Sequence, residues 1–301
     1  MGIRLVLIFV FCCLCRAGSG LAKPATQPAR EYRIRIHRPE KAGQVYKVTL
    51  RGETKYDRER KRAFDFNGTR KVLATDANGL PVKSELTCGS CVAEADTGRT
   101  ELLVADTVVI VAKKDGKVDV QPKDPNGNLD CQAKGPLATA TYMLPLPAFD
   151  MDAWFGTDKP RKVGESWPIH AEVIRAAIEK SGDSTDNQNI TGRTTLLGLT
   201  KVGGIACLDL RIEMEVSLSA PKVRQSSTME KNDTMTTLRI ALPLDESVPI
   251  VSRKFKMVSD FAMKVSLPDG TQRRHERRAE SSVEVTSLPV GKHRKSHEAS
   301  K

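Results

Sequence analysis

Residues 207–218, Cys-Leu-Asp-Leu-Arg-Ile-Glu-Met-Glu-Val-Ser-Leu, decide the fold class of this chain. From Leu208 onward, apolar and polar residues alternate without interruption. A period of two indicates a β-strand with one buried face, whereas an amphipathic helix repeats its apolar positions at intervals of three and four residues. The stretch therefore predicts a long strand in an antiparallel sheet that is covered on one side.

The sequence on either side extends this strand into a meander of hairpins. Residues 192–201 precede it across a turn at 202–204 that contains two glycines. Downstream, residues 255–265 place apolar side chains on one parity, and Pro-Asp-Gly at 268–270 leads into a last strand. Consecutive antiparallel strands joined by short turns form such a meander.

The first half of the chain repeats this pattern. Asn78-Gly79 separates the strand-like residues 63–74 from residues 82–88, and a second hairpin follows with Asp115-Gly116 at its turn. Both dipeptides are typical of tight hairpin turns.

Two segments near the N-terminus alternate in the same way. Residues 32–37 place Tyr, Ile and Ile between basic residues, and residues 46–51 follow the same period after a turn. The similar period and the intervening turn predict that these two segments pair with each other as antiparallel strands.

One segment departs from the period of two. Residues 170–180 are rich in Ala, Glu and Ile, and they stop at Ser181-Gly182, which is typical of a helix end. We therefore predict a mainly β protein: a curved antiparallel sheet or open barrel with one short helix packed on it.

The composition excludes several classes of protein. The chain has 301 residues, of which 39% are hydrophobic, and a formal net charge of +11. Its apolar residues fall into regular patterns, which argues against a disordered chain. The basic charge favours contact with anionic surfaces.

The two ends of the chain differ from its body. Residues 1–22 have the basic start, the apolar run and the small residues of a secretory signal peptide, and ten apolar residues are too few to span a bilayer. We expect a flexible leader at 23–30, a β-rich domain at 31–289 and a disordered basic tail at 290–301. Two subdomains, about 31–145 and 160–289, are the alternative to a single domain. The protein is expected to be exported, periplasmic or extracellular, without a lipid anchor.

The sequence contains no recognisable catalytic motif. A phosphate-binding loop, a dinucleotide-binding glycine pattern and a zinc-protease motif are all missing, and Ser166 lacks the glycine elbow of hydrolases. We therefore expect no enzymatic activity, no cofactor and no metal.

Two basic clusters are candidates for contact with an anionic surface. A strand rich in charge can also be an edge strand protected against aggregation. Aromatic residues are absent from both clusters, so we expect no nucleic-acid partner. The clusters comprise Arg58, Arg60, Lys61, Arg62, Arg273, Arg274, Arg277 and Arg278.

Four cysteines remain after the predicted signal peptide: Cys88, Cys91, Cys131 and Cys207. In an exported protein they predict disulfides, for which three pairings are open. Cys88 and Cys91 have the spacing of a redox dithiol, but no helix follows them to lower a thiol pKa. A zinc site is the weakest of these interpretations because Cys131 and Cys207 are far apart in the sequence.

A further motif carries a resemblance to a protein family. Lys-Val-Gly-Glu-Ser-Trp at 162–167, followed by Leu-Leu-Gly-Leu-Thr-Lys-Val-Gly-Gly-Ile-Ala-Cys at 196–207, resembles uncharacterised secreted β-rich bacterial proteins with a Gly-Asp/Glu-Ser-Trp motif. The likeness covers about residues 136–218, with Glu165 in place of the commoner Asp. It implies an exported envelope protein similar in outline to lipoprotein carriers, and it transfers no catalytic residue or ligand.

Three functions are compatible with these patterns. The first is a non-enzymatic envelope protein that binds an apolar or amphiphilic ligand, such as a lipid, between the sheet and the helix. The second is an interaction or scaffold protein that docks on anionic envelope surfaces through its basic strands, and the third is a thiol oxidoreductase at Cys88 and Cys91. For the first, the expected lining residues are Trp167, Val173, Ile174, Ile178, Phe255, Met257, Phe261 and Met263.

Overall fold

The computed structural model describes residues 30–56, 60–114, 117–141, 150–180, 188–218, 222–224, 227–266 and 271–290. The predicted signal peptide, the leader up to residue 29 and the tail from residue 291 lie outside this part of the chain. The predicted division at 31–145 and 160–289 stays a prediction.

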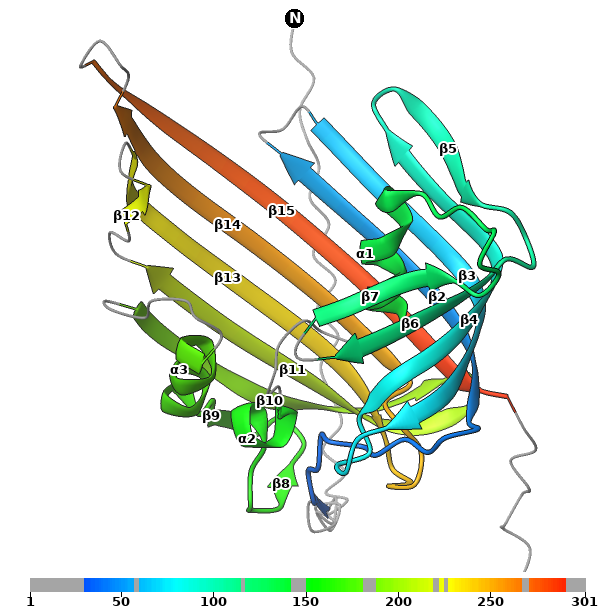
Figure 1. The fold of residues 1–301 in the computed structure, drawn as a ribbon. Helices are drawn as coiled ribbons and strands as arrows, with labels where there is room; N and C mark the ends of the chain where they lie inside the picture. The colour runs from blue at the N-terminus through cyan, green and yellow to red at the C-terminus, as the bar shows by residue number, and fades with distance from the viewer. Residues whose placement is uncertain are drawn as a thin grey trace, which may run out of the picture. The chain divides into compact units, whose positions relative to one another are not determined.

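One antiparallel sheet of 13 strands dominates the fold (Figure 1). Its order is β7-β6-β4-β3-β2-β15-β14-β13-β11-β10-β9, with β5 also paired to β4 and β12 also paired to β13. The ends of this path, β7 and β9, do not pair with each other in the described structure, so the sheet is open. The strands are β2 (Val45–Tyr56), β3 (Arg60–Thr75), β4 (Pro81–Ala95), β5 (Gly98–Leu103), β6 (Val108–Lys114), β7 (Lys117–Pro122), β9 (Ser166–Pro168), β10 (Gln188–Val202), β11 (Ile205–Leu218), β12 (Lys222–Arg224), β13 (Ser227–Pro243), β14 (Ser252–Ser266) and β15 (Gln272–Pro289).

The predicted fold class is confirmed. The alternating stretch that ends at Leu218 is β11, and its predicted partner is β10, which pairs with it antiparallel along nearly its whole length. Gly203 and Gly204 make the turn between them, and both have positive φ angles, 55° and 82°, which glycine adopts at low cost. The hairpins β3–β4 and β6–β7 also form where the sequence predicts them.

Three short helices accompany the sheet. The predicted helix is α3 (Ala171–Lys180), which packs on β10 and on α2 (Met151–Phe155). A helix that the sequence did not predict, α1 (Cys131–Ala140), lies against β7, β2 and β3 (Figure 1). Asp130 caps α1 by accepting the amide hydrogen of Gln132 at 2.8 Å.

The predicted pairing of residues 32–37 with residues 46–51 is wrong. Only β1 (Glu31–Tyr32) is a strand in the first segment, and it pairs with β8 (Arg161–Lys162). The chain then passes α2, where the backbone amides of Ile36 and His37 donate to the carboxylate of Asp152 at 2.5 and 3.1 Å. The alternation thus predicted the burial of Ile34 and Ile36 correctly. The backbone amides here donate hydrogen bonds to the Asp152 side chain, however, and not to a neighbouring strand.

The sheet buries separate hydrophobic clusters in its two halves. The first cluster gathers side chains of β2 to β7, α1 and Val285 of β15. The second gathers side chains of β9, β10, β11, β13, α2 and α3, together with Ile34 and Ile36. A small third cluster surrounds Cys207 at the β10–β11 turn. The strand β14 lies in the sheet order between the strands of the first two clusters.

Candidate functional site

Strand register defines which side chains share a face of the sheet. Leu238 of β13 lies opposite Phe255 of β14, which lies opposite Val283 of β15. Val283 in turn lies opposite Gly52 of β2, which is opposite Phe64 of β3. Side chains of directly opposed residues point to the same side of a sheet. We call this side, which also bears most of the buried strand residues of the first two clusters, the inner face.

Burial of the inner face falls steadily along β15. Val285 is 3% exposed, Val283 and Ala279 are half-buried, and Arg277 is exposed. The inner-face side chains of this one strand therefore change from buried at Val285 to solvent-exposed at Arg277.

The neighbouring strands show the same change. On β13, Ile240 is fully buried and Leu238 is half-buried; on β11, Ile212 is buried and Met214 is half-buried. Because register aligns these positions across the sheet, the inner face has one closed end and one open end.

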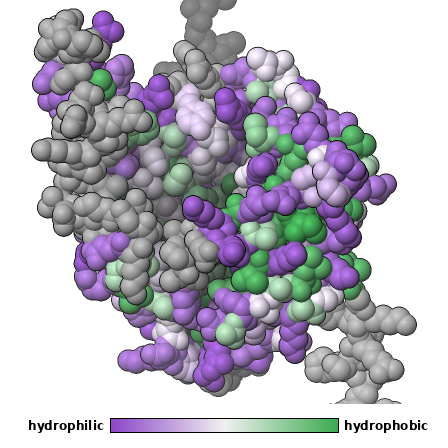
Figure 2. Space-filling model, viewed as in Figure 1, coloured by the Kyte–Doolittle hydropathy of each residue, from purple (hydrophilic) through white to green (hydrophobic). Residues whose placement is uncertain are grey.

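Between the two ends lies a band of partly exposed apolar side chains, which we call the half-buried stripe. Three of its members, Phe255, Met257 and Phe261 on β14, belong to none of the hydrophobic clusters. Away from the stripe, Figure 2 shows hydrophobic side chains at the surface near the position of α1 and β7, where the first cluster lies, among hydrophilic ones. The stripe consists of Met214, Val216, Leu238, Phe255, Met257, Phe261, Ala279 and Val283.

Basic side chains border the open end of the stripe. On β15, Arg273, His275 and Arg277 occupy consecutive inner-face positions, and Arg277 lies directly opposite Phe261. On β3, Arg62 lies on the same face, opposite Thr54. All four are exposed, and we call them the basic rim.

Acidic side chains are confined to the other side of the strands. The inner-face positions of β2, β3, β4, β11, β13, β14 and β15, as register defines them, contain no Asp or Glu among the described residues. On the opposite side, the outer face, acids and bases alternate, as in Asp260 opposite Arg278. On these described strands, acidic side chains therefore lie on the outer face, whereas basic side chains lie on both faces.

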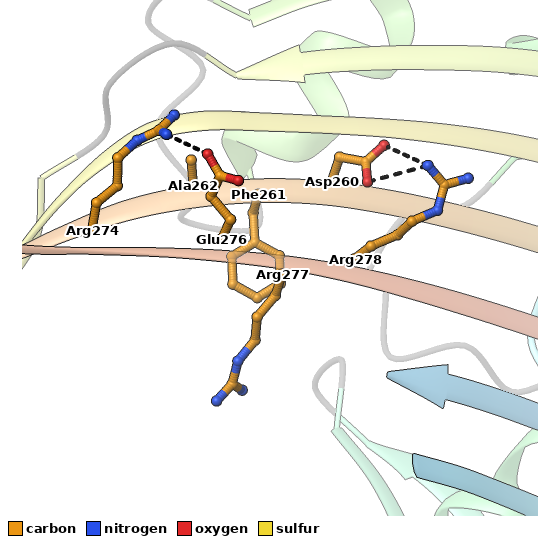
Figure 3. Close-up of a pocket in the computed structure, with 7 residues that line it drawn as sticks. All are labelled: Asp260, Phe261, Ala262, Arg274, Glu276, Arg277 and Arg278. Atoms are coloured by element: carbon orange, nitrogen blue, oxygen red, sulfur yellow. Dashed lines mark hydrogen bonds and ion pairs between the residues drawn. The ribbon is translucent and has the colours of Figure 1, made fainter. Parts of the chain in front are cut away.

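The outer-face cations of the predicted basic clusters are neutralised by acids. Arg278 lies 3.4 Å from Asp260, and Arg274 lies 2.7 Å from Glu230 and also pairs with Glu276. Figure 3 shows the Arg274–Glu276 and Arg278–Asp260 pairs on one side of β14 and β15, with Phe261 and Arg277 on the other. The same strands line a pocket of about 390 Å³. Hydrogen bonds from Lys264 and Arg274 hold the pKa of Glu230 below its usual value, so this acid stays charged.

The structure thus divides the two predicted clusters by face. Lys61 joins the outer-face set, at 3.2 Å from Glu53. Arg58 lies outside the described residues, and only the backbone of Arg60 is described. The register nevertheless brings the start of β3 and the first half of β15 to the same end of the sheet, one on each side of β2.

The predicted lining residues separate into two groups. Trp167 and Ile174 are buried in the second cluster, where the Trp167 indole donates to the carbonyl of Phe155 at 2.8 Å. Ile178 packs at the edge of that cluster, and Val173 is 44% exposed. The helix α3 therefore covers β10 and adds to a packed core.

The β14 residues of the prediction do share one face. Phe255, Met257 and Phe261 have the expected parity, and the backbone of Met263 continues it although its side chain is outside the described set. Sequence reasoning missed the rest of the stripe, Met214, Val216, Leu238, Ala279 and Val283. Their alternation was visible, but only strand order and register show that they share a face of the sheet with the β14 residues.

The four cysteines are all unbonded, so the structure contains none of the predicted disulfides. Cys131 is exposed at the start of α1, and Cys207 is buried in the third cluster, each in a different surrounding. Cys131 and Cys207 therefore lie in separate parts of the fold. The number of cysteines in the sequence could not show this separation.

Cys88 and Cys91 are neighbours because of a β-bulge. Residues three apart on a regular strand point to opposite faces, but Asn67 pairs with Ser90 and Gly68 with Cys88, which leaves Gly89 as an extra residue. Both thiols consequently enter the first cluster. A hydrogen bond between them lowers the pKa of Cys88, the acceptor, and raises the pKa of Cys91, the donor.

Comparisons with known proteins leave the family open. No family model and no curated protein matches the chain. A structure of lipovitellin, described by its lipid–protein interactions, aligns at 7% identity with a TM-score of 0.37. The alignment covers 83% of this chain and only 25% of the lipovitellin chain. P47 from Clostridium botulinum A2 aligns at 6% identity over 83% of this chain and 82% of its own, with a TM-score of 0.20. A porin variant from Rh. blastica aligns at 9% identity over 81% and 99%, with a TM-score of 0.15. Scores this low establish no shared fold.

Within the described residues, none of the helices has the length and apolar composition needed to cross a bilayer.

Proposed function

We propose that this protein is an exported binding protein that holds an apolar or amphiphilic molecule on the half-buried stripe of its inner face. The supporting observation is that Ile240 on the inner face is fully buried, whereas apolar side chains farther along the same face, as far as Phe261, are half-buried and stand among Ser and Thr residues. In a solid protein core the same parity would remain packed along the strand, because interiors are as dense as organic crystals. Half-buried apolar side chains on a face that opens to solvent are typical of a ligand-binding surface.

The chemistry of the stripe suits binding rather than catalysis. Its side chains are aliphatic, aromatic or thioether groups, which recognise hydrocarbon without directional bonds. Methionines such as Met214 and Met257 adapt their shape to flexible ligands. Export of the protein is supported by the apolar N-terminal run at residues 5–14.

A matched pair of methionine substitutions tests the proposal. Met257 is half-buried on the inner face, whereas Met235 is 58% exposed on the outer face of the adjacent strand. Fluorescence titration with a BODIPY-labelled fatty acid should show binding that Met257→Gln weakens several-fold and Met235→Gln leaves unchanged. Native mass spectrometry should also detect co-purifying lipid. A protein that takes up neither the probe nor any lipid would refute the proposal.

A further inference from the structure

We infer that the molecule bound on the half-buried stripe is an anionic lipid, with its hydrocarbon on the stripe and its phosphate headgroup at the basic rim. This inference rests on the proposed function and adds to it the headgroup charge and the direction in which the ligand lies. Three observations support it.

The first observation is the order of chemistry along one face. On β15 the inner-face positions change from Val283 and Ala279 to Arg277, His275 and Arg273. An amphiphile has the same order, since its hydrocarbon is followed by a polar head. The stripe and the rim are therefore complementary to a molecule lying along the strands with its head toward Arg273.

The second observation is the absence of acids from the inner-face positions of the described strands around the stripe. An anionic headgroup at these described positions would therefore lie beside no carboxylate of the same strand faces. Arginine suits phosphate in particular, because its planar guanidinium can donate two parallel hydrogen bonds.

The third observation is the contrast with the outer face of the same strand. Arg274 and Arg278 alternate in sequence with Arg273 and Arg277, but their carboxylate partners sit beside them on the outer face. On the inner face of the same strand, Arg277 lies directly opposite the aromatic side chain of Phe261 (Figure 3). Basic and apolar side chains therefore adjoin each other on the inner face.

This arrangement supplies its own control for an experiment. The double variant Arg273→Gln/Arg277→Gln removes two charges from the rim, and Arg274→Gln/Arg278→Gln removes two charges from the outer face of the same strand. Binding is measured by isothermal titration calorimetry with dioctanoyl phosphatidylglycerol and dioctanoyl phosphatidylcholine, both below their critical micelle concentrations. The two probes have equal hydrocarbon and differ in headgroup charge.

We expect the purified protein to bind phosphatidylglycerol about tenfold more tightly than phosphatidylcholine, a preference that added salt should reduce. The rim variant should lose this preference because its phosphatidylglycerol affinity falls more than its phosphatidylcholine affinity, while the outer-face variant should match the unsubstituted protein. Equal binding of both lipids, weakened by Met257→Gln, would overturn the inference and leave the proposed function standing. Equal losses in the two arginine variants would also overturn it, since the headgroup would then not lie at the rim. Binding of neither lipid would refute the proposed function itself.

Discussion

Arg70 and Glu40 form an ion pair from which water is excluded, with side chains that are 0% and 8% exposed. Arg70 also donates to the carbonyl of Thr141 at 2.8 Å and lies over the ring of Tyr46, 4.8 Å from its centroid. One guanidinium thus joins the segment before β2, the strands β2 and β3, and the end of α1. These contacts hold α1 over the first cluster.

Removal of the Glu40 carboxylate should therefore lower the free energy of unfolding. Glu40→Gln is expected to lower the free energy of unfolding by about 3–5 kcal/mol, because it leaves the Arg70 charge buried without its counterion. Glu284→Gln is the control: Glu284 lies 3.3 Å from Lys254 and the two side chains are 51% and 60% exposed, so its loss should cost less than about 1 kcal/mol. Urea unfolding followed by circular dichroism measures both, and equal effects would contradict the prediction.

The open and closed ends of the inner face should respond differently to polar substitution. Ile240 is fully buried, and Ile240→Gln should lower stability by about 3 kcal/mol or more through lost packing and a buried amide. Met257 is already partly exposed, and Met257→Gln should cost less than about 1 kcal/mol. Urea unfolding monitored by tryptophan fluorescence compares them; a large loss at Met257 would mean that the stripe is part of a packed core.

Stability should fall at alkaline pH partly because of Cys207. Burial raises the pKa of its thiol from 9.0 to about 11. Between these values the unfolded chain releases the thiol proton and the folded chain keeps it, so rising pH favours unfolding. From pH 8 to pH 10 this group should remove about 1 kcal/mol of stability. Cys207→Ala should make the measured decline smaller by that amount, and an unchanged decline would contradict the assignment.

The thiols should react at different rates. Cys131 is exposed, whereas Cys88 and Cys91 are 2% and 0% exposed. In folded protein that lacks residues 1–22, and with them Cys12, Cys13 and Cys15, 5,5′-dithiobis(2-nitrobenzoic acid) should label one thiol rapidly. Cys131→Ser should abolish that fast phase, since buried thiols are shielded from the reagent. The remaining thiols should react only in denaturant. Fast labelling of Cys88 would instead favour the oxidoreductase hypothesis.

The fold class was predictable because alternation is a local property. The residues of β10 and β11 carry their period and their glycine turn within one short stretch, and burial follows that period closely. Pairing partners are not local. Residues 32–37 have the period of a strand, yet Asp152, more than 100 positions away, accepts two of their amides. The helix α1 was missed because Gly135 and Pro136 inside it argue against a helix.

The candidate site was predictable only in part, for the same reason. Parity alone grouped Phe255, Met257 and Phe261, and the register confirms that grouping. The proposed partner across the cavity, α3, packs elsewhere because the position of a helix depends on contacts that no sequence period encodes. The alternation along β15 was enough to predict that its arginines divide between two faces. The acids that neutralise Arg274 and Arg278 could not be predicted in this way, because Glu230 and Asp260 come from β13 and β14.

Because Arg273, His275 and Arg277 follow one another on the inner face of β15, the first half of this strand presents a row of basic side chains to solvent. If the proposed lipid binding is correct, long-range attraction by this row should raise the rate at which the protein meets an anionic bilayer, and added salt should reduce that rate.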